Sequence, residues 1–190
     1  MYDKYTTDAL ILSAKDFSEN DRMLALFTRE FGLVWARVGA VRKESSKMRS
    51  ALQNYSRAQV SLIKGKTGWR AGGAVAESDS REWPRESLPS YARLGLLVTR
   101  LVHGEERNDF LFESISAARS RLRASAEMSS IIELLSVARI LFALGYISPE
   151  ALKSSLFSHS SISEEDIVEA ERLHDTLLST VNESLTTTML

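Results

Sequence analysis

The sequence predicts an α+β chain of two domains, a small five-stranded barrel over residues 1–80 followed by an all-helical domain over residues 81–190. Short apolar segments separated by turn residues fill the first part, and apolar residues recur at helical spacing in the second. A chain of 190 residues has room for two such domains, each with its own hydrophobic core. The polar stretch 78–89 is the expected linker.

Five segments of the first part are rich in Val, Ile, Leu or aromatic residues, as strands are. Turn-forming residues separate these segments, which span residues 7–13, 22–28, 33–41, 58–64 and 68–76. Five strands are too few for a sandwich, and no crossover helices lie between them to build a parallel sheet. A closed or nearly closed barrel removes exposed strand edges, and the glycines at 39, 72 and 73 fit bends or bulges in it.

Alternation along the third segment separates two kinds of side chain. One face carries small apolar residues that suit a core: Val34, Ala36 and Val38. The other face carries Leu33, Trp35 and Arg37, so the Trp35 ring and the Arg37 guanidinium are expected to point together toward solvent or a ligand. In the fifth segment Trp69 and Arg70 fall on opposite faces, so only one of them can join that surface.

Helical periodicity replaces the strand pattern after residue 80 and indicates about five helices. Apolar residues recur at helical spacing over residues 91–102, 110–122 and 131–142. Helix-start signals occur at Asn108-Asp109, Ser148-Pro149-Glu150 and Ser163-Glu164-Glu165-Asp166. Gly104 and Gly145 mark helix ends.

The charge is uneven, although 24 Lys and Arg nearly balance 25 Asp and Glu. Residues 1–80 hold 13 basic against 9 acidic residues, and residues 81–190 hold 11 against 16. Within residues 29–70, ten basic residues accompany only Glu30 and Glu44. Such a local excess suits a polyanionic partner, and a solvated basic face that binds nothing is the alternative.

Exposed aromatic rings among cations would bind nucleic acid, since Lys and Arg neutralise phosphates and aromatic rings stack on bases. The aromatic candidates are Trp35, Tyr55 and Trp69. Trp35 has the strongest case because Arg37 shares its face. The basic candidates are Arg37, Arg42, Lys43, Lys47, Arg49, Lys64, Lys66 and Arg70.

Signatures of catalysis, metal binding and membrane insertion are not found in the sequence. The chain has no cysteine, and its three histidines at 103, 159 and 174 lack ligand spacing, so we expect neither a metal nor another cofactor. Gly65-Lys66-Thr67 lacks the first glycine of a phosphate-binding loop, because Val60 takes that position. No nucleophile, base and orienting group assemble, and no apolar run reaches about 18 residues, so we expect a non-enzymatic, cytoplasmic protein.

Several segments carry a family resemblance. In the first part these are residues 8–13 (DALILS), 19–32 (ENDRMLALFTREFG) and 46–53 (SKMRSALQ), and in the second part 110–113 (FLFE) and 139–146 (RILFALGY). Together they resemble the signature segments of RecO, a family of bacterial recombination mediators. The likeness is strong over roughly residues 1–80, weaker over 90–150 and absent beyond.

The resemblance implies an N-terminal OB-fold barrel, a C-terminal helical domain and a non-enzymatic DNA repair factor associated with the nucleoid. Such a factor binds single- and double-stranded DNA, anneals complementary strands and, with RecR, helps RecA load onto DNA covered by single-strand-binding protein. The family's basic barrel surface corresponds to the candidates between Arg37 and Arg70. The acidic tail of single-strand-binding protein would dock on the helical domain, where the candidates are Arg100, Arg119, Arg121, Arg123 and Arg139.

The chain departs from the family pattern in two respects. Many members carry four zinc-binding cysteines just after the Leu-Gly-Tyr segment, whereas residues 152–157 here read LKSSLF, so no zinc is expected. The chain is also shorter than is usual in the family, which bears on the last helices and their partner contacts. Two other classes stay open: a protein-interaction adaptor that does not bind DNA, and an OB-fold binder of RNA or oligosaccharide.

Overall fold

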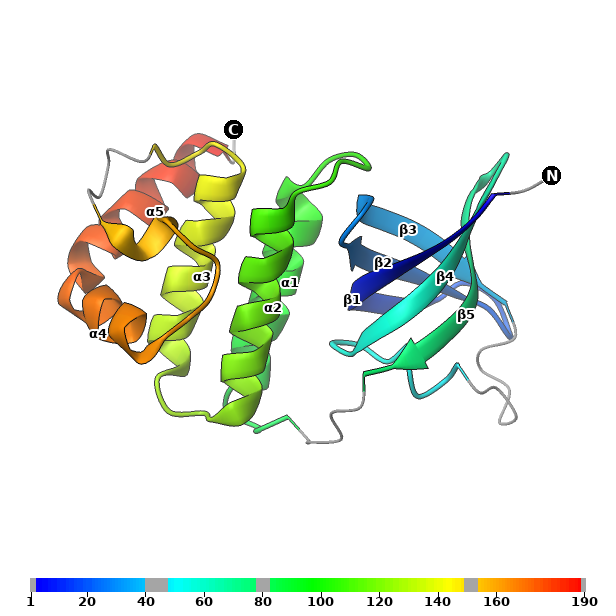
Figure 1. The fold of residues 1–190 in the computed structure, drawn as a ribbon, viewed down its shortest axis with the longest axis horizontal. Helices are drawn as coiled ribbons and strands as arrows, with labels where there is room; N and C mark the ends of the chain where they lie inside the picture. The colour runs from blue at the N-terminus through cyan, green and yellow to red at the C-terminus, as the bar shows by residue number, and fades with distance from the viewer. Residues whose placement is uncertain (1–2, 40–47, 78–82, 149–153, 189–190) are drawn as a thin grey trace. The chain divides into compact units, whose positions relative to one another are not determined.

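The computed structural model describes residues 3–39, 48–77, 83–148 and 154–188. The chain divides into two compact units. The first comprises Met1–Ser80 together with Val102–Asn108, and the second comprises Arg81–Leu101 together with Asp109–Leu190. Figure 1 colours the strands of the first unit from blue to green and the helices of the second from green to red.

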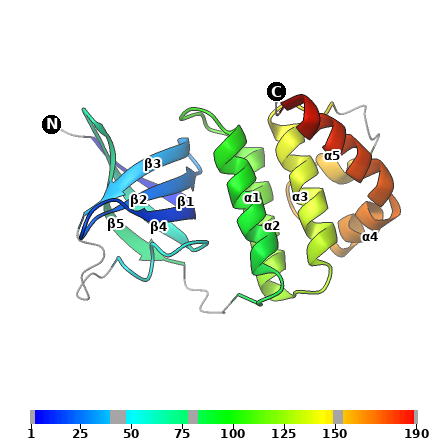
Figure 2. The same cartoon turned by 180° about the vertical axis from the view of Figure 1, so that it is seen from behind.

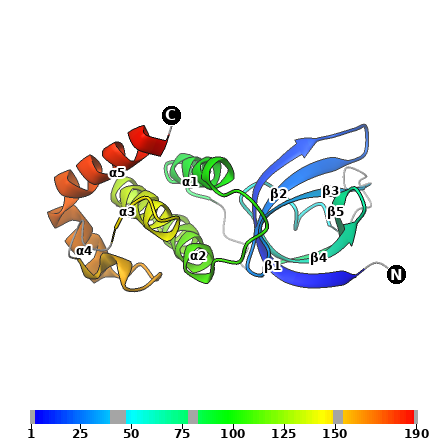
Figure 3. The same cartoon turned by 90° about the horizontal axis from the view of Figure 1, so that it is seen from above.

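The first unit is a closed five-stranded barrel, which confirms the predicted OB-fold architecture. Its strands follow one another around the barrel in the order β1-β2-β3-β5-β4, and Figure 3 shows them curling around a common axis. All neighbours are antiparallel except β3 and β5, which run parallel. The strands are β1 (Lys4–Asp16), β2 (Arg22–Thr28), β3 (Gly32–Val38), β4 (Arg57–Gly65) and β5 (Gly68–Ala76).

The longest strand, β1, extends beyond the predicted segment 7–13 because it has two successive partners. Its first half pairs with β4 and its second half with β2. A register shift after Ile11 lets the strand bend between the two pairings. A second shift places Gly72 as the extra residue between Ala71 and Gly73, which confirms the predicted bulge in β5.

The barrel core is formed by the inward-facing side chains of all five strands. Leu24, Leu26, Val34, Val60 and Leu62 are fully buried there. Ala51 and Leu52 fill the same core from the segment between β3 and β4.

The second unit is all-helical, with α3 (Ser129–Ala143) packed against α1, α2, α4 and α5. Figure 2 shows α3 between the α1–α2 pair and the α4–α5 pair. Its central place fits a sequence that is apolar on several faces, with Ile131, Ile132, Leu135 and Leu141 all buried. The other elements are α1 (Leu88–Leu101), α2 (Asp109–Ala124), the short 3₁₀ helix η2 (Ser155–Phe157), α4 (Glu164–Arg172) and α5 (His174–Thr188).

Most of the predicted helix boundaries are present in the structure. Helix α2 begins at Asp109, and Ser163 and Asp166 form a reciprocal capping box at the start of α4. Gly145 follows α3 with a φ of +80°. The predicted start at Ser148-Pro149-Glu150 lies largely outside the described residues. Among the residues that are described, no helix has the length and apolar content needed to cross a membrane.

Candidate nucleic-acid interface

Strand β3 has one face in the barrel core and one face outside, as its alternation predicts. Val34, Ala36 and Val38 are fully buried, whereas the Trp35 side chain is 48% exposed and Arg37 is exposed beside it. Leu33 departs from the pattern, because it is buried although it shares the parity of Trp35. The outer face of β3 therefore presents one large aromatic ring and one guanidinium.

Strand β5 adds a second guanidinium to this face. The parallel pairing aligns Arg37 with Arg70, and Arg70 is exposed. The backbones of adjacent strands lie about 5 Å apart, so two residues in register on them are neighbours. Of the two residues in β5 that compete for this surface, Arg70 is thus the one that joins it. We call Trp35, Arg37 and Arg70 the β3–β5 cationic face.

Two residues that the sequence analysis did not select surround Arg37. The Arg37 Nε and Nη2 atoms donate to Asp21 Oδ2 at 3.0 and 2.5 Å. The Arg37 guanidinium carbon lies 5.0 Å from the centroid of the Phe17 ring, a cation–π distance, and Phe17 is 55% exposed. An aromatic residue within the polar turn Phe17–Asp21 was the available signal, since such a turn offers no core to bury a ring.

Lys64 and Trp69 are engaged with Glu105, from the segment that belongs to the barrel unit. Lys64 Nζ and Trp69 Nε1 donate to the two Glu105 oxygens at 2.7 and 2.6 Å. The hydrogen bond from Lys64, aided by that from Trp69, holds the pKa of Glu105 below its ordinary value despite partial desolvation.

Trp69 therefore does not serve as a stacking platform, which corrects the candidate list. Its ring is only 5% exposed and belongs to the barrel core. Tyr5 and Phe31 pack against it, with ring centroids 5.8 and 5.2 Å away. A buried indole of this kind stabilises the barrel and offers no face to a ligand.

The remaining barrel candidates fall into three groups. Arg49 and Lys66 are exposed, and within the described residues neither has a carboxylate partner. Tyr55 is half-buried in a turn, where its backbone N–H donates to the Ile11 carbonyl. Arg42, Lys43 and Lys47 lie outside the described residues.

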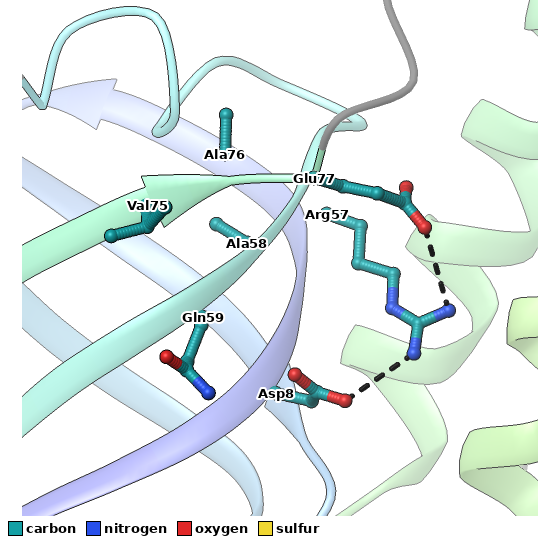
Figure 4. A pocket seen from close by; sticks show the side chains of 7 residues that line it. All are labelled: Asp8, Arg57, Ala58, Gln59, Val75, Ala76 and Glu77. Carbon is teal, nitrogen blue, oxygen red and sulfur yellow. Dashed lines mark hydrogen bonds and ion pairs between the residues drawn. The ribbon is translucent and has the colours of Figure 1, made fainter.

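Several other cations of the 29–70 window are paired with acids. Arg57 lies between Asp8 and Glu77, at 3.3 and 3.8 Å, in a pocket of about 340 Å³ (Figure 4). Arg29 is 3.9 Å from Asp8 as well. Asp8 and Glu77, like Asp21 and Glu105, lie outside residues 29–70, so counting charge within that window overstates the positive charge at the surface.

In the helical unit, three of the five arginines selected as partner-binding candidates are buried, which is a second correction. Arg139 is fully buried and donates to backbone carbonyls, and burial lowers the pKa of its guanidinium against the opposing effect of Asp166. Arg119 and Arg123 are also buried, with their guanidinium carbons 5.9 and 5.5 Å from the Trp83 ring centroid. None of these three presents its charge to an anionic peptide.

The other two partner-binding candidates remain at the surface. Arg100 is exposed in the last turn of α1, and Arg121 pairs with Glu164. In the part of the chain that the structure describes, no group of three or more His, Cys, Asp or Glu side chains gathers in a way that could hold a metal ion.

Comparison with known proteins identifies the barrel. Residues 1–68 match the family model described as "Recombination protein O N terminal". The chain is 35% identical over 85 residues to DNA repair protein RecO of Desulfitobacterium hafniense, covering 45% of this chain and 28% of the relative. It is 32% identical over 144 residues to the RecO protein of Pelotomaculum thermopropionicum, covering 72% of this chain and 55% of the relative.

A third relative, DNA repair protein RecO of Myxococcus xanthus, is 36% identical over 62 residues, covering 33% of this chain and 25% of the relative. The chain thus spans about half the length of these relatives or less. The matched region coincides with strands β1 to β4 of the closed barrel and reaches the first residue of β5. By its N-terminal barrel, this chain belongs to the RecO family.

Proposed function

We propose that this protein acts in DNA repair as a recombination mediator that binds DNA through its barrel. The β3–β5 cationic face supports the proposal, because it places an exposed indole beside two guanidinium groups on the outside of an OB fold. Of the two cations, Arg70 supplies affinity for phosphates, because Arg37 is paired with Asp21, and the exposed ring supplies stacking on bases. The relatives named as DNA repair proteins agree with this role.

The likeness to the RecO family supports a more specific proposal. We propose that the protein binds single- and double-stranded DNA, anneals complementary strands and, with RecR, assists RecA loading on DNA covered by single-strand-binding protein. It would act in the cytoplasm at the nucleoid, through binding without catalysis. For the acidic tail of single-strand-binding protein, Arg100 and Arg121 remain the accessible candidates among the arginines selected from the sequence.

A salt titration tests DNA binding directly. A labelled single-stranded oligonucleotide should bind with an affinity that falls linearly on a log–log plot against salt concentration. Arg70→Gln should reduce the magnitude of that slope by about 0.7, the value for one phosphate contact on a single strand. Affinity that ignores salt in the unmodified protein would contradict the proposal.

The two other classes give different results in the same assay. An adaptor that binds only proteins would leave the oligonucleotide free at all salt concentrations. A binder of RNA or oligosaccharide would release DNA when either competitor is added at equal concentration. Arg29→Gln is the matched control for Arg70→Gln, because Arg29 lies in the same barrel but near Asp8.

A further inference from the structure

We infer that Phe17 and the guanidinium of Arg37 form a stacking site for an unpaired nucleobase, which makes the barrel prefer single strands to duplex DNA. This inference rests on the proposed function and goes further, because it names the group that the site binds and the strand type that it selects. The evidence comes from three features: the exposure of Phe17, the pairing of Arg37 and the position of Trp35.

Phe17 is held at the surface by its turn. The backbone N–H groups of Phe17 and Ser18 both donate to the Asp21 carbonyl, at 3.0 and 3.3 Å, so the turn is closed on itself. The ring is 55% exposed, and it is not among the side chains that form or pack against the barrel core. A single exposed ring is common at protein surfaces, but this one lies 5.0 Å from the Arg37 guanidinium carbon, so the two flat groups together offer a surface on which a base can stack.

Arg37 contributes a flat surface more than a net charge. Two of its nitrogens donate to the same Asp21 oxygen, whose side chain is only 17% exposed, so the ion pair balances the guanidinium charge. The plane of an arginine still stacks on aromatic faces when its edge is engaged in hydrogen bonds. Phosphate contact is left to Arg70 on the neighbouring strand, for which no carboxylate partner lies within the described residues.

Trp35 provides a second ring on the same surface. It lies two residues before Arg37 on the outer face of β3, which places the two side chains roughly 7 Å apart along the strand. Bases in a duplex are stacked on one another and paired, so their faces reach such rings only after unstacking that costs a few kcal/mol per nucleotide. An unpaired strand avoids that cost, and the flat groups therefore select it.

The test compares one single-stranded oligonucleotide with a blunt duplex of the same sequence at several salt concentrations. Phe17→Ala should weaken single-strand binding by about tenfold, within the range that alanine substitution of a stacking ring produces. Duplex affinity should change less than twofold, and the salt slope should stay that of the unmodified protein because no phosphate contact is lost. Phe17→Leu should behave like Phe17→Ala, because it also lacks a ring. Phe17→Trp keeps a ring, so its single-strand affinity should equal that of the unmodified protein.

Two further variants separate stacking from charge and from simple apolarity. Arg37→Lys keeps the charge but removes the plane, so it should weaken single-strand binding without changing the slope. Val75→Ala is the matched control, because Val75 is another exposed apolar side chain of the barrel, 69% exposed on β5, and it should bind like the unmodified protein.

The outcomes distinguish the two proposals. If the unmodified protein binds no DNA, the proposed function fails and this inference fails with it. If the unmodified protein binds with the expected salt dependence but Phe17→Ala keeps full single-strand affinity, only the stacking site is refuted. Equal losses on single strand and duplex, or an equal loss in Val75→Ala, refute it as well.

Discussion

Two loops of this molecule are each held by a cation and a carboxylate, in opposite surroundings. In the helical unit, the Arg139 guanidinium is fully buried and donates to the carbonyls of Leu156, Ser160 and Ser161 at 2.8, 3.3 and 2.6 Å. In the barrel unit, segment 102–108 is held by Lys64 and Trp69 through Glu105, and the Lys64 and Glu105 side chains are 55% and 40% exposed.

The comparison shows that burial, more than bond length, sets what such an anchor contributes. An exposed ion pair contributes about 0–1 kcal/mol, because water and salt screen it. Removing one partner from a buried charge network costs about 3–5 kcal/mol, because the groups left behind cannot be solvated. The Arg139 anchor should therefore be essential to its unit, and the Glu105 anchor should be dispensable.

Arg139→Met gives the largest expected effect. It leaves three carbonyls of the 156–161 segment and the buried Asp166 carboxylate without the guanidinium, so the helical unit should lose about 3–5 kcal/mol of unfolding free energy. Urea unfolding followed by far-UV circular dichroism measures the loss. Arg100→Met, at an exposed position of α1, should change stability by less than about 0.5 kcal/mol. Similar stability in both variants would refute the ranking by burial.

The role of Arg139 also shows where sequence reasoning ends. Strand alternation around Trp35 and the capping box at Ser163 are local patterns, read from neighbouring residues, and both were predicted correctly. Charge partners are not local: Asp21 and Glu105 reach Arg37 and Lys64 only through the folded chain. From sequence alone, an arginine in a helix is predicted to be exposed, because the pattern does not show which backbone carbonyls will enclose its guanidinium.

The residues of the candidate interface also divide into those that a local pattern predicts and those that only the folded chain brings together. The shared face of Trp35 and Arg37 follows from period-two alternation, and Arg70 joins it through a parallel pairing that no sequence pattern reveals. Phe17 was not selected from the sequence, because a single aromatic residue in a turn belongs to no periodic pattern from which its position could be predicted. Its proximity to Arg37 is a product of the β1–β2 turn folding back onto β3.

Gly32→Ala gives an intermediate effect and tests whether the backbone, rather than Glu105, fixes segment 102–108. Gly32 has a φ of +60°, and a Cβ there would lie 2.3 Å from the Glu106 carbonyl oxygen. The segment must therefore move, and the barrel unit should lose about 2–3 kcal/mol. Urea unfolding followed by far-UV circular dichroism measures this loss.

Gly104→Ala is the control for that substitution. Gly104 has a φ of +89° in the same segment, but nothing lies within 4 Å of the added Cβ, so only backbone strain of about 1 kcal/mol is expected. Equal losses in the two variants would mean that the close approach of Gly32 to Glu106 contributes nothing.

Glu105→Gln gives the smallest effect, and its pH dependence is the sharpest check on the exposed anchor. Because the folded-state pKa of Glu105 lies below its ordinary value, the ionised carboxylate stabilises the fold above the unfolded pKa of about 4.3. That contribution is lost as pH falls through the lowered pKa. After allowance for solvent screening, we expect a difference of about 0.5 kcal/mol in unfolding free energy between the unmodified protein and Glu105→Gln at pH 7, and this difference should shrink toward zero in acid.

Urea unfolding across this pH range measures the difference. Glu106→Gln is the control and should show no difference, because Glu106 is an exposed neighbour without an ion pair among the described residues. A loss of several kcal/mol in Glu105→Gln would place the exposed anchor on a par with Arg139 and remove the distinction between them.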